Sequence, residues 1–306
     1  MGTPAFACPI LEALIARPDP VVGVVCQPDR PRGRGLGVTA PEVKQLAETH
    51  GIPVLQPERL RPPAVLDQLS ALAPDLIVVA AYGKILPPAL LTLPPQGCIN
   101  VHASLLPRHR GAAPIAWAIL AGDAVTGVTI MAMNEGMDEG DILLVRDTPI
   151  GADETGGELA ARLSALGAQA IGEAIDGRKA GRIRPTPQPA TGITMAPRIA
   201  REHCRIDWTR PAIELARQIR ALAPAPSAFT TLGGRLLKAH RAAAEAETSS
   251  AAPGTVIAAG PSGIAIATGA GTLRLLEVQL EGRRRLGAAE FVAGSRLAPG
   301  TCLGTA

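Results

Sequence analysis

Short runs of β-branched and aliphatic residues recur through the first half of the chain, and they limit the possible folds more than any other feature. These runs are Val21–Cys26, Leu76–Ala81, Cys98–His102, Thr126–Met133 and Ile142–Pro149. Helical patterns separate some of them, as at Pro41–His50, and an amphipathic helix is predicted at Glu158–Gly177. Continuous apolar strands between helices are typical of a parallel sheet that is covered on both faces. The first half is therefore predicted to be an α/β domain.

The composition changes near residue 185. Pro185–Pro197 is rich in Pro and Thr and has no period, so it is predicted to be an interdomain linker. A helix is predicted at Pro211–Leu222, and Ala242–Pro253 is predicted to be a surface loop. Short strands with glycine turns are predicted at Arg235–Ala242, Gly254–Ala259, Gly263–Thr268 and Thr272–Leu280. This pattern favours a small β-barrel, and the predicted organisation is a domain at 1–184, a linker at 185–201 and a second domain at 202–306.

The composition excludes several classes of protein. The five cysteines are dispersed, with no spacing that fits zinc, which favours free thiols in a reducing, cytoplasmic compartment. No apolar run is long enough for a membrane span, and no basic segment of a signal peptide opens the chain. From residue 190 onward there are 14 lysines and arginines against 8 acidic residues, whereas the whole chain has a net charge of only +3. A basic final third favours an anionic partner such as nucleic acid, or else is a solvated face.

The first residues raise a question about the sheet. Met1–Phe6 has the pattern of a turn from a strand into a helix, yet no strand precedes it. A sheet of this kind normally opens with a buried strand. We therefore expect the true start to lie upstream of Met1, and we expect the 306-residue chain to be poorly soluble or inactive without the added strand.

Two polar residues stand at the end of one predicted strand. Asn100 and His102 are two apart, so alternation along the strand directs both side chains to the same face. Ligands of open α/β sheets bind beyond the carboxyl ends of the strands. An amide and a protonated imidazole both donate hydrogen bonds and together suit an oxyanion that develops on a carbonyl carbon. Taken alone, the pair is more often two ordinary polar residues at a strand end.

A second segment strengthens the functional interpretation. Asn134–Ile142 follows the neighbouring predicted strand, and its Asp138 is placed to orient or charge His102. A nucleophilic serine is poorly supported, because the chain has no GxSxG motif and Ser104 has no base other than His102. The glycines of Gly33–Gly37 do not directly join a strand to a helix and make a weak dinucleotide fingerprint.

The stretch from Asn100 to Ile115, NVHASLLPRHRGAAPI, together with GMDEGD from Gly136, resembles the folate-dependent formyltransferases. Supporting stretches run nearly from end to end, among them AYGKILP from Ala81, TGVTIM from Thr126, GITMAP from Gly192 and RIDW from Arg205. The resemblance implies a Rossmann-like parallel-sheet domain, with its first strand apparently missing here, followed by a small OB-like β-barrel.

The resemblance also implies the site. Asn100, His102 and Asp138 match the catalytic trio of the family. Asn100 and His102 would stabilise the oxyanion, while Asp138 would keep His102 cationic and help to relay the proton. The residues that match the binding segments for 10-formyltetrahydrofolate are Ser104, Leu105, Leu106 and Pro107, and Tyr82, Gly83, Ile85 and Leu86 in the pterin loop. No metal is implied.

The implied acceptor is the α-amine of methionine carried by initiator tRNA. Pro28–Pro41 matches a loop that contacts the acceptor stem, and the predicted tRNA contacts are Arg30, Arg32, Arg34, Arg283, Arg284 and Arg285. A monomer is expected. Two other readings stay open: a formyltransferase acting on a small amine, such as a ribonucleotide or a nucleotide sugar, and an RNA-binding or inactive relative, which would be expected to lose the trio.

Overall fold

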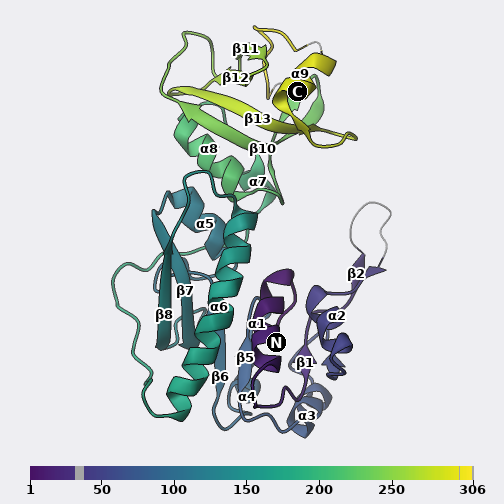
Figure 1. The fold of residues 1–306 in the computed structure, drawn as a ribbon, viewed down its shortest axis with the longest axis vertical. Coiled ribbons are helices and arrows are strands. Elements are labelled where there is room, and N and C mark those ends of the chain that lie inside the picture. The colour runs from purple at the N-terminus through teal and green to yellow at the C-terminus, as the bar shows by residue number, and fades with distance from the viewer. Residues whose placement is uncertain (32–37, 296, 305–306) are drawn as a thin grey trace. The chain divides into compact units, whose positions relative to one another are not determined.

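The computed structural model describes residues 1–31, 38–295 and 297–304, and the chain divides into two compact units (Figure 1). Unit 1 comprises Met1–Pro114, Val125–Pro149 and Ala160–Pro197. Unit 2 comprises Ile115–Ala124, Ile150–Leu159 and Arg198–Ala306. The segment predicted to be a linker thus lies in unit 1 as far as Pro197.

Unit 1 alternates helices and strands, as its sequence pattern predicts. Its helical elements are η1 (Ala5–Ala7), α1 (Cys8–Ile15), α2 (Glu42–Thr49), α3 (Pro63–Ala71), α4 (Pro88–Leu91) and most of α6 (Gly156–Lys179), while α5 (Pro114–Ala121) belongs almost wholly to unit 2. Its strands are β1 (Val24–Val25), β2 (Arg30–Pro31), β3 (Val38–Thr39), β4 (Val54–Leu55), β5 (Ile77–Val79), β6 (Cys98–His102), β7 (Val125–Ala132) and β8 (Ile142–Pro149). A strand is predicted at Val21–Cys26, but in the structure only the two residues of β1 form a strand there.

The sheet that carries the candidate site has the order β5-β6-β7-β8. β5 and β6 are parallel, but β6 pairs with β7, and β7 with β8, in antiparallel register. This half of the sheet therefore departs from the expected parallel arrangement. For β7 and β8 the reason is the connection, because they are joined by the short loop 133–141, and a parallel pair needs a much longer crossover.

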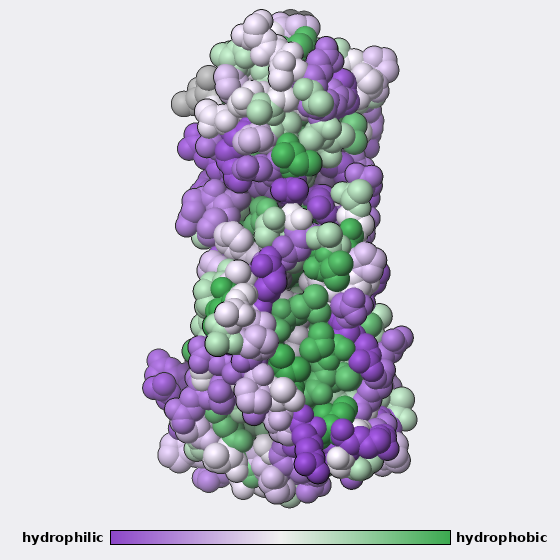
Figure 2. Space-filling view, turned by 90° about the vertical axis from the view of Figure 1, so that its left-hand side faces the viewer, coloured by the Kyte–Doolittle hydropathy of each residue, from purple (hydrophilic) through white to green (hydrophobic). Residues whose placement is uncertain are grey.

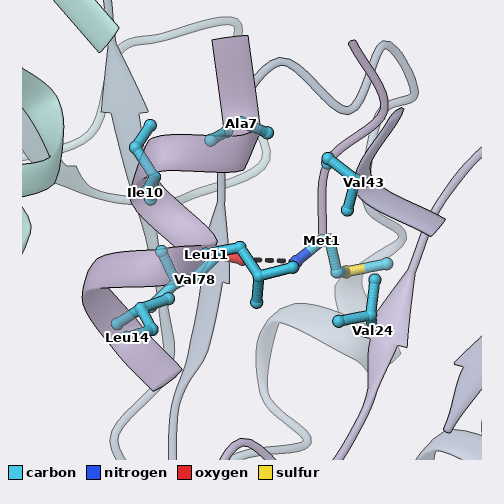
Figure 3. Close-up of a pocket in the computed structure, with 10 residues that line it drawn as sticks. Met1, Ala7, Ile10, Leu11, Leu14, Val24, Val43 and Val78 are labelled. Atoms are coloured by element: carbon cyan, nitrogen blue, oxygen red, sulfur yellow. Dashed lines mark hydrogen bonds between the residues drawn. The ribbon is translucent and has the colours of Figure 1, made fainter. Parts of the chain in front are cut away.

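Met1 and Gly2 lie between the strand pair β1-β4 and the sheet β5-β8. The Gly2 amide donates to the Val25 carbonyl at 3.0 Å, and the Met1 carbonyl accepts from the Ala80 amide at 2.9 Å. The Met1 amine donates to the Val78 carbonyl at 2.6 Å (Figure 3), and burial lowers the pKa of that amine to about 6. These two residues thus lie, over a short length, at the place in the sheet that the expected first strand would fill.

A small cavity of about 30 Å³ adjoins Met1. Apolar side chains of α1, α2, β1 and β5 point into it, as Figure 3 shows, among them Ile10, Leu14, Val24, Val43 and Val78. On the other side of β5, a cluster of buried side chains forms a core around Leu90. Helix α6 approaches β6 closely, since a Cβ at Gly167 would lie 2.8 Å from Val101.

Unit 2 is built on an antiparallel sheet, as predicted. Its strands are β9 (Ala228–Leu232), β10 (Arg235–Glu245), β11 (Val256–Gly260), β12 (Gly263–Ala267), β13 (Thr272–Leu280) and β14 (Leu286–Gly287), in the order β11-β12-β13-β10-β9 with β14 beside β13. Its remaining helices are α7 (Arg201–Cys204), α8 (Ala212–Ala221) and α9 (Ala288–Gly294). The sequence missed β9, β14, α7 and α9, and β10 extends to Glu245, three residues beyond the end of the predicted strand. The closure of this sheet into a barrel stays a prediction.

Hydrophobic residues are also present on the surface. Figure 2 shows them gathered over unit 1, in the lower part of that view, with hydrophilic residues around them. Large hydrophobic side chains exposed on unit 1 include Val22, Ile85, Val125, Met137 and Val145. No helix among the described residues is long and apolar enough to cross a membrane.

Candidate active site

The candidate site is built on β6, whose backbone is held on one side by β5 and on the other by β7. Asn100 pairs with Val79 and Met131, and His102 pairs with Thr129. Strand alternation sends the side chains of Asn100 and His102 to one face, while Val101 faces the helix α6. The sequence predicts this strand with the same bounds that the structure has.

His102 is 5% exposed and contacts protein atoms through both ring nitrogens. Its Nε2 lies 3.0 Å from the His109 carbonyl oxygen. A carbonyl only accepts, so Nε2 carries the hydrogen and this contact fixes the tautomer. Nδ1 lies 3.6 Å from Asp138 Oδ2, an ion-pair distance that is too long for a hydrogen bond. In the doubly protonated ring, an Nδ1 hydrogen is therefore available to a substrate atom beside Asp138.

Asp138 reaches the same point from the loop between β7 and β8. Its Oδ1 accepts from Asn100 Nδ2 at 3.4 Å, and its Oδ2 accepts from the Gly111 amide at 2.8 Å. The backbone of Asp138 has φ 53°. A non-glycine residue in this left-handed region stores roughly 1–3 kcal/mol of strain and persists only where its surroundings fix it. The structure therefore brings together the three residues predicted as the catalytic trio.

The segment Ser104–Pro107 forms a tight turn directly after β6. The Ser104 hydroxyl donates to the Arg108 carbonyl at 2.6 Å and is fully buried. Thr129 of β7 holds the turn, because its hydroxyl donates to the Ser104 carbonyl at 2.7 Å and accepts from the Leu106 amide at 3.1 Å. Sequence reasoning missed Thr129, although a hydroxyl in a buried strand is a signal that it has a polar partner.

The predicted pterin loop is divided between core and surface. Tyr82 and Leu86 are 2% and 3% exposed and belong to the core cluster, and burial raises the pKa of Tyr82 to about 12. Ile85, by contrast, is 77% exposed, and Gly83 has a left-handed backbone with φ 78°. Lys84 Nζ donates to the carbonyls of Pro57 and Glu58 at 2.8 and 2.7 Å, which anchors the loop.

The predicted tRNA contacts fall in two places. Arg30 is exposed in β2, whereas Arg32 and Arg34 lie outside the described residues. In unit 2, Arg284 pairs with Glu290 and Arg285 pairs with Glu277. Arg283 is exposed in the same turn. Among the described residues no group of acidic, histidine and cysteine side chains is arranged to hold a metal ion.

Comparison with known proteins places the chain in a family. The sequence profile described as "Formyl transferase" matches residues 1–175, which is more than half of the chain. The chain belongs to the formyl transferase family. A second profile, "Formyl transferase, C-terminal domain", matches residues 198–296, so the family similarity extends over both units.

Two relatives show how close this similarity is. The methionyl-tRNA formyltransferase of Myxococcus xanthus is 52% identical over 301 residues, covering 98% of this chain and 96% of the relative. That of Geobacter sulfurreducens is 49% identical over 306 residues, covering 100% and 96%.

Solved structures support the fold. A methionyl-tRNA formyltransferase from Clostridium thermocellum has a TM-score of 0.53 at 17% identity, covering 73% of this chain and 93% of that one. An N-formyltransferase from Helicobacter canadensis, solved with folinic acid and dTDP-3-aminofucose, has a TM-score of 0.65 at 16% identity, covering 90% and 97%. The expected fold, a Rossmann-like domain followed by an antiparallel-sheet domain, is thereby confirmed.

Proposed function

We propose that this formyl transferase moves the formyl group of 10-formyltetrahydrofolate to the α-amino group of methionine esterified to initiator tRNA. The observation that carries the proposal is the 52% identity, over nearly the full length of both chains, to the methionyl-tRNA formyltransferase of M. xanthus. The alignment includes the basic final third of the chain, whose positive charge suits the phosphates of a tRNA.

The chemistry follows from the three side chains on β6 and its neighbouring loop. The neutral amine attacks the formyl carbon, and negative charge develops on the formyl oxygen. The Asn100 amide has two hydrogens and gives one to Asp138, so the second is available to that oxygen. The Nδ1 side of His102 supplies a further donor. The tetrahedral intermediate then collapses as its C–N bond to folate breaks.

Proton movement balances this reaction. The attacking amine loses one proton, and the folate nitrogen that leaves gains one. Asp138 Oδ2 lies beside His102 Nδ1, and the pair forms a route on which a proton moves between these two groups. Nε2 keeps its hydrogen and donates it to the His109 carbonyl throughout, which keeps the ring oriented.

The folate and the tRNA are assigned to different residues. For folate we propose the turn Ser104–Pro107 and the loop Tyr82–Leu86, where the exposed side chain of Ile85 offers an apolar surface for a flat ring. For tRNA we propose Arg30, Arg32, Arg34 and Arg283–Arg285, which supply positive charge for phosphates. We propose that the enzyme acts as a monomer.

The test is a formylation assay on the full chain with three acceptors: methionyl initiator tRNA, methionyl elongator tRNA and an amino sugar nucleotide. The initiator tRNA is expected to be formylated fastest when 10-formyltetrahydrofolate is the donor. Faster transfer to the sugar amine would replace the proposed substrate with a small amine. The absence of transfer to all three would leave the inactive relative as the correct reading.

A further inference from the structure

Gln188 connects the two loops that frame the candidate active site. It lies within Pro185–Pro197, the segment that the sequence predicts to be a linker. Its Nε2 donates to the carbonyls of Asp138 and Gly140 at 2.7 and 2.8 Å. Its Oε1 accepts from Arg110 Nε and Nη2 at 3.1 and 2.8 Å. The amide thus uses both of its hydrogens and both lone pairs of its oxygen.

The loop that holds Asp138 requires such a partner. Its backbone is left-handed at Asp138, and it passes so close to β7 that a Cβ at Gly140 would lie 1.7 Å from the Ala132 carbonyl oxygen. Two carbonyl oxygens of this loop point at one side-chain amide. Without a donor between them they would repel each other, and a buried acceptor without a partner costs roughly 1–3 kcal/mol.

The other end of the contact is equally tied to the site. Arg110 is 9% exposed, and its Nη1 also lies 3.6 Å from Glu139. The residue before it, His109, accepts the His102 Nε2 hydrogen, and the residue after it, Gly111, donates to the Asp138 carboxylate. Arg110, Gly111, Asp138 and Gln188 therefore form a closed ring of contacts around the carboxylate.

Gln188 is itself held in place by backbone pairing on both sides. Thr186 and Ile142 exchange two hydrogen bonds of 2.8 and 2.9 Å. Farther along, the Arg110 amide donates to the Thr194 carbonyl at 2.9 Å, and the Ala196 amide donates to the Arg110 carbonyl at 2.7 Å. A flexible linker would not place a side-chain amide reproducibly, whereas a segment fixed at both ends does.

We propose that Gln188 is a positioning residue for formyl transfer, which fixes the backbone of Asp138 and, through Arg110, the loop that orients His102. This inference rests on the proposed function. Gln188 contacts no reacting atom in this arrangement, and it acts only through Asp138 and Arg110. Displacement of a catalytic group by about 1 Å is known to cost on the order of 10²-fold in rate.

Two substitutions separate the two ends of the contact. Gln188→Ala removes both donors and leaves the Arg110 guanidinium without this acceptor. Gln188→Glu keeps an acceptor for Arg110 but places a carboxylate against the carbonyls of Asp138 and Gly140. We expect each variant to lower the single-turnover rate about 10- to 100-fold with little change in tRNA affinity. Gln45→Ala is the matched control, because Gln45 is exposed on α2 and its side-chain amide donates to the Ala40 carbonyl nearby.

The deciding measurement is a double-mutant cycle with Asp138→Ala. If Gln188 acts through Asp138 and the Arg110 loop, Gln188→Ala should lower the rate clearly less in the Asp138→Ala background than in wild type. A rate loss that is the same in both backgrounds would overturn the proposal, as would wild-type activity in Gln188→Ala. Melting temperatures of all variants identify any that fail to fold. If Gln188→Ala fails to fold, Gln188→Glu takes its place in the double-mutant cycle. If wild type formylates no acceptor, the proposed function fails instead.

Discussion

The residues proposed for catalysis in unit 1 and the arginines proposed for tRNA in unit 2 are placed in different ways. Unit 1 contains a network of buried polar side chains that are each less than a tenth exposed and that hydrogen bonds connect around one point. These residues are His102, Ser104, His109, Arg110 and Thr129. Unit 2 keeps arginines at the surface in pairs with acidic residues, such as Arg241 with Glu158 at 2.9 Å. A buried network fixes one geometry, whereas exposed ion pairs contribute about 0–1 kcal/mol each. The comparison teaches that changes in the buried network of unit 1 should alter the rate, and changes at the exposed arginines of unit 2 should alter binding.

The largest effect is expected from Asn100→Asp in unit 1. The substitution preserves the size of the side chain, removes its donated hydrogens and places a second carboxylate beside Asp138. Loss of one donor to an oxyanion costs about 10²–10³-fold in rate, and the added charge opposes the developing oxyanion, so we expect roughly 10³-fold or more. Single-turnover formylation measures it. A loss below about tenfold would place Asn100 outside the reaction.

Asp138→Asn should have the next largest effect. An amide has one acceptor oxygen, whereas Asp138 accepts from Asn100 at one oxygen and from Gly111 at the other. The variant also removes the charge beside His102. We expect a rate about 10²-fold lower. The control is Glu135→Gln, which removes the charge of an exposed residue in the same loop and should retain full activity. Equal losses in both variants would mean that only the charge of the loop matters.

In unit 2 the expected change is in binding. Arg284 is already paired with Glu290, whereas Arg283 is an exposed neighbour in the same turn. We expect Arg283→Gln to weaken tRNA binding and to reduce its logarithmic salt slope by about one. Arg284→Gln should change the slope less, and neither variant should change the single-turnover rate at saturating tRNA. A rate loss in Arg283→Gln would break the division of labour between the two units.

The smallest effect concerns stability at alkaline pH. Burial raises the pKa of Cys26 and of Cys98 each to about 11, from an ordinary value of 9. Between pH 9 and 11 the unfolded chain loses these protons while the folded chain keeps them, so stability falls as the pH rises, by roughly 1–3 kcal/mol per thiol. Melting temperatures across this range should fall less steeply in Cys98→Ala. Exposed Cys302 supplies the control, since Cys302→Ala should leave the slope unchanged.

The sequence predicted the strand that carries Asn100 and His102 because β alternation is a local property. The approach of Asp138 was also expected, since its loop follows the neighbouring strand. The role of Gln188 was not foreseeable, because its partners lie 48 to 78 positions away in the chain and its own segment has no periodicity. The antiparallel pairing of β7 with β8 likewise depends on the length of the loop between them, not on the composition of the strands. The roles of the predicted site residues stay predictions until the variants are measured.

The most direct test of the account is His102→Ala, with single-turnover formylation of initiator methionyl-tRNA measured beside the affinity for that tRNA. His102 is buried in unit 1, and in the proposed mechanism it donates to charge that exists only in the transition state. The account predicts a rate about 10²–10³-fold lower, with tRNA affinity unchanged. A rate and an affinity that fall by the same factor would mean that His102 serves binding, and this result would contradict the account.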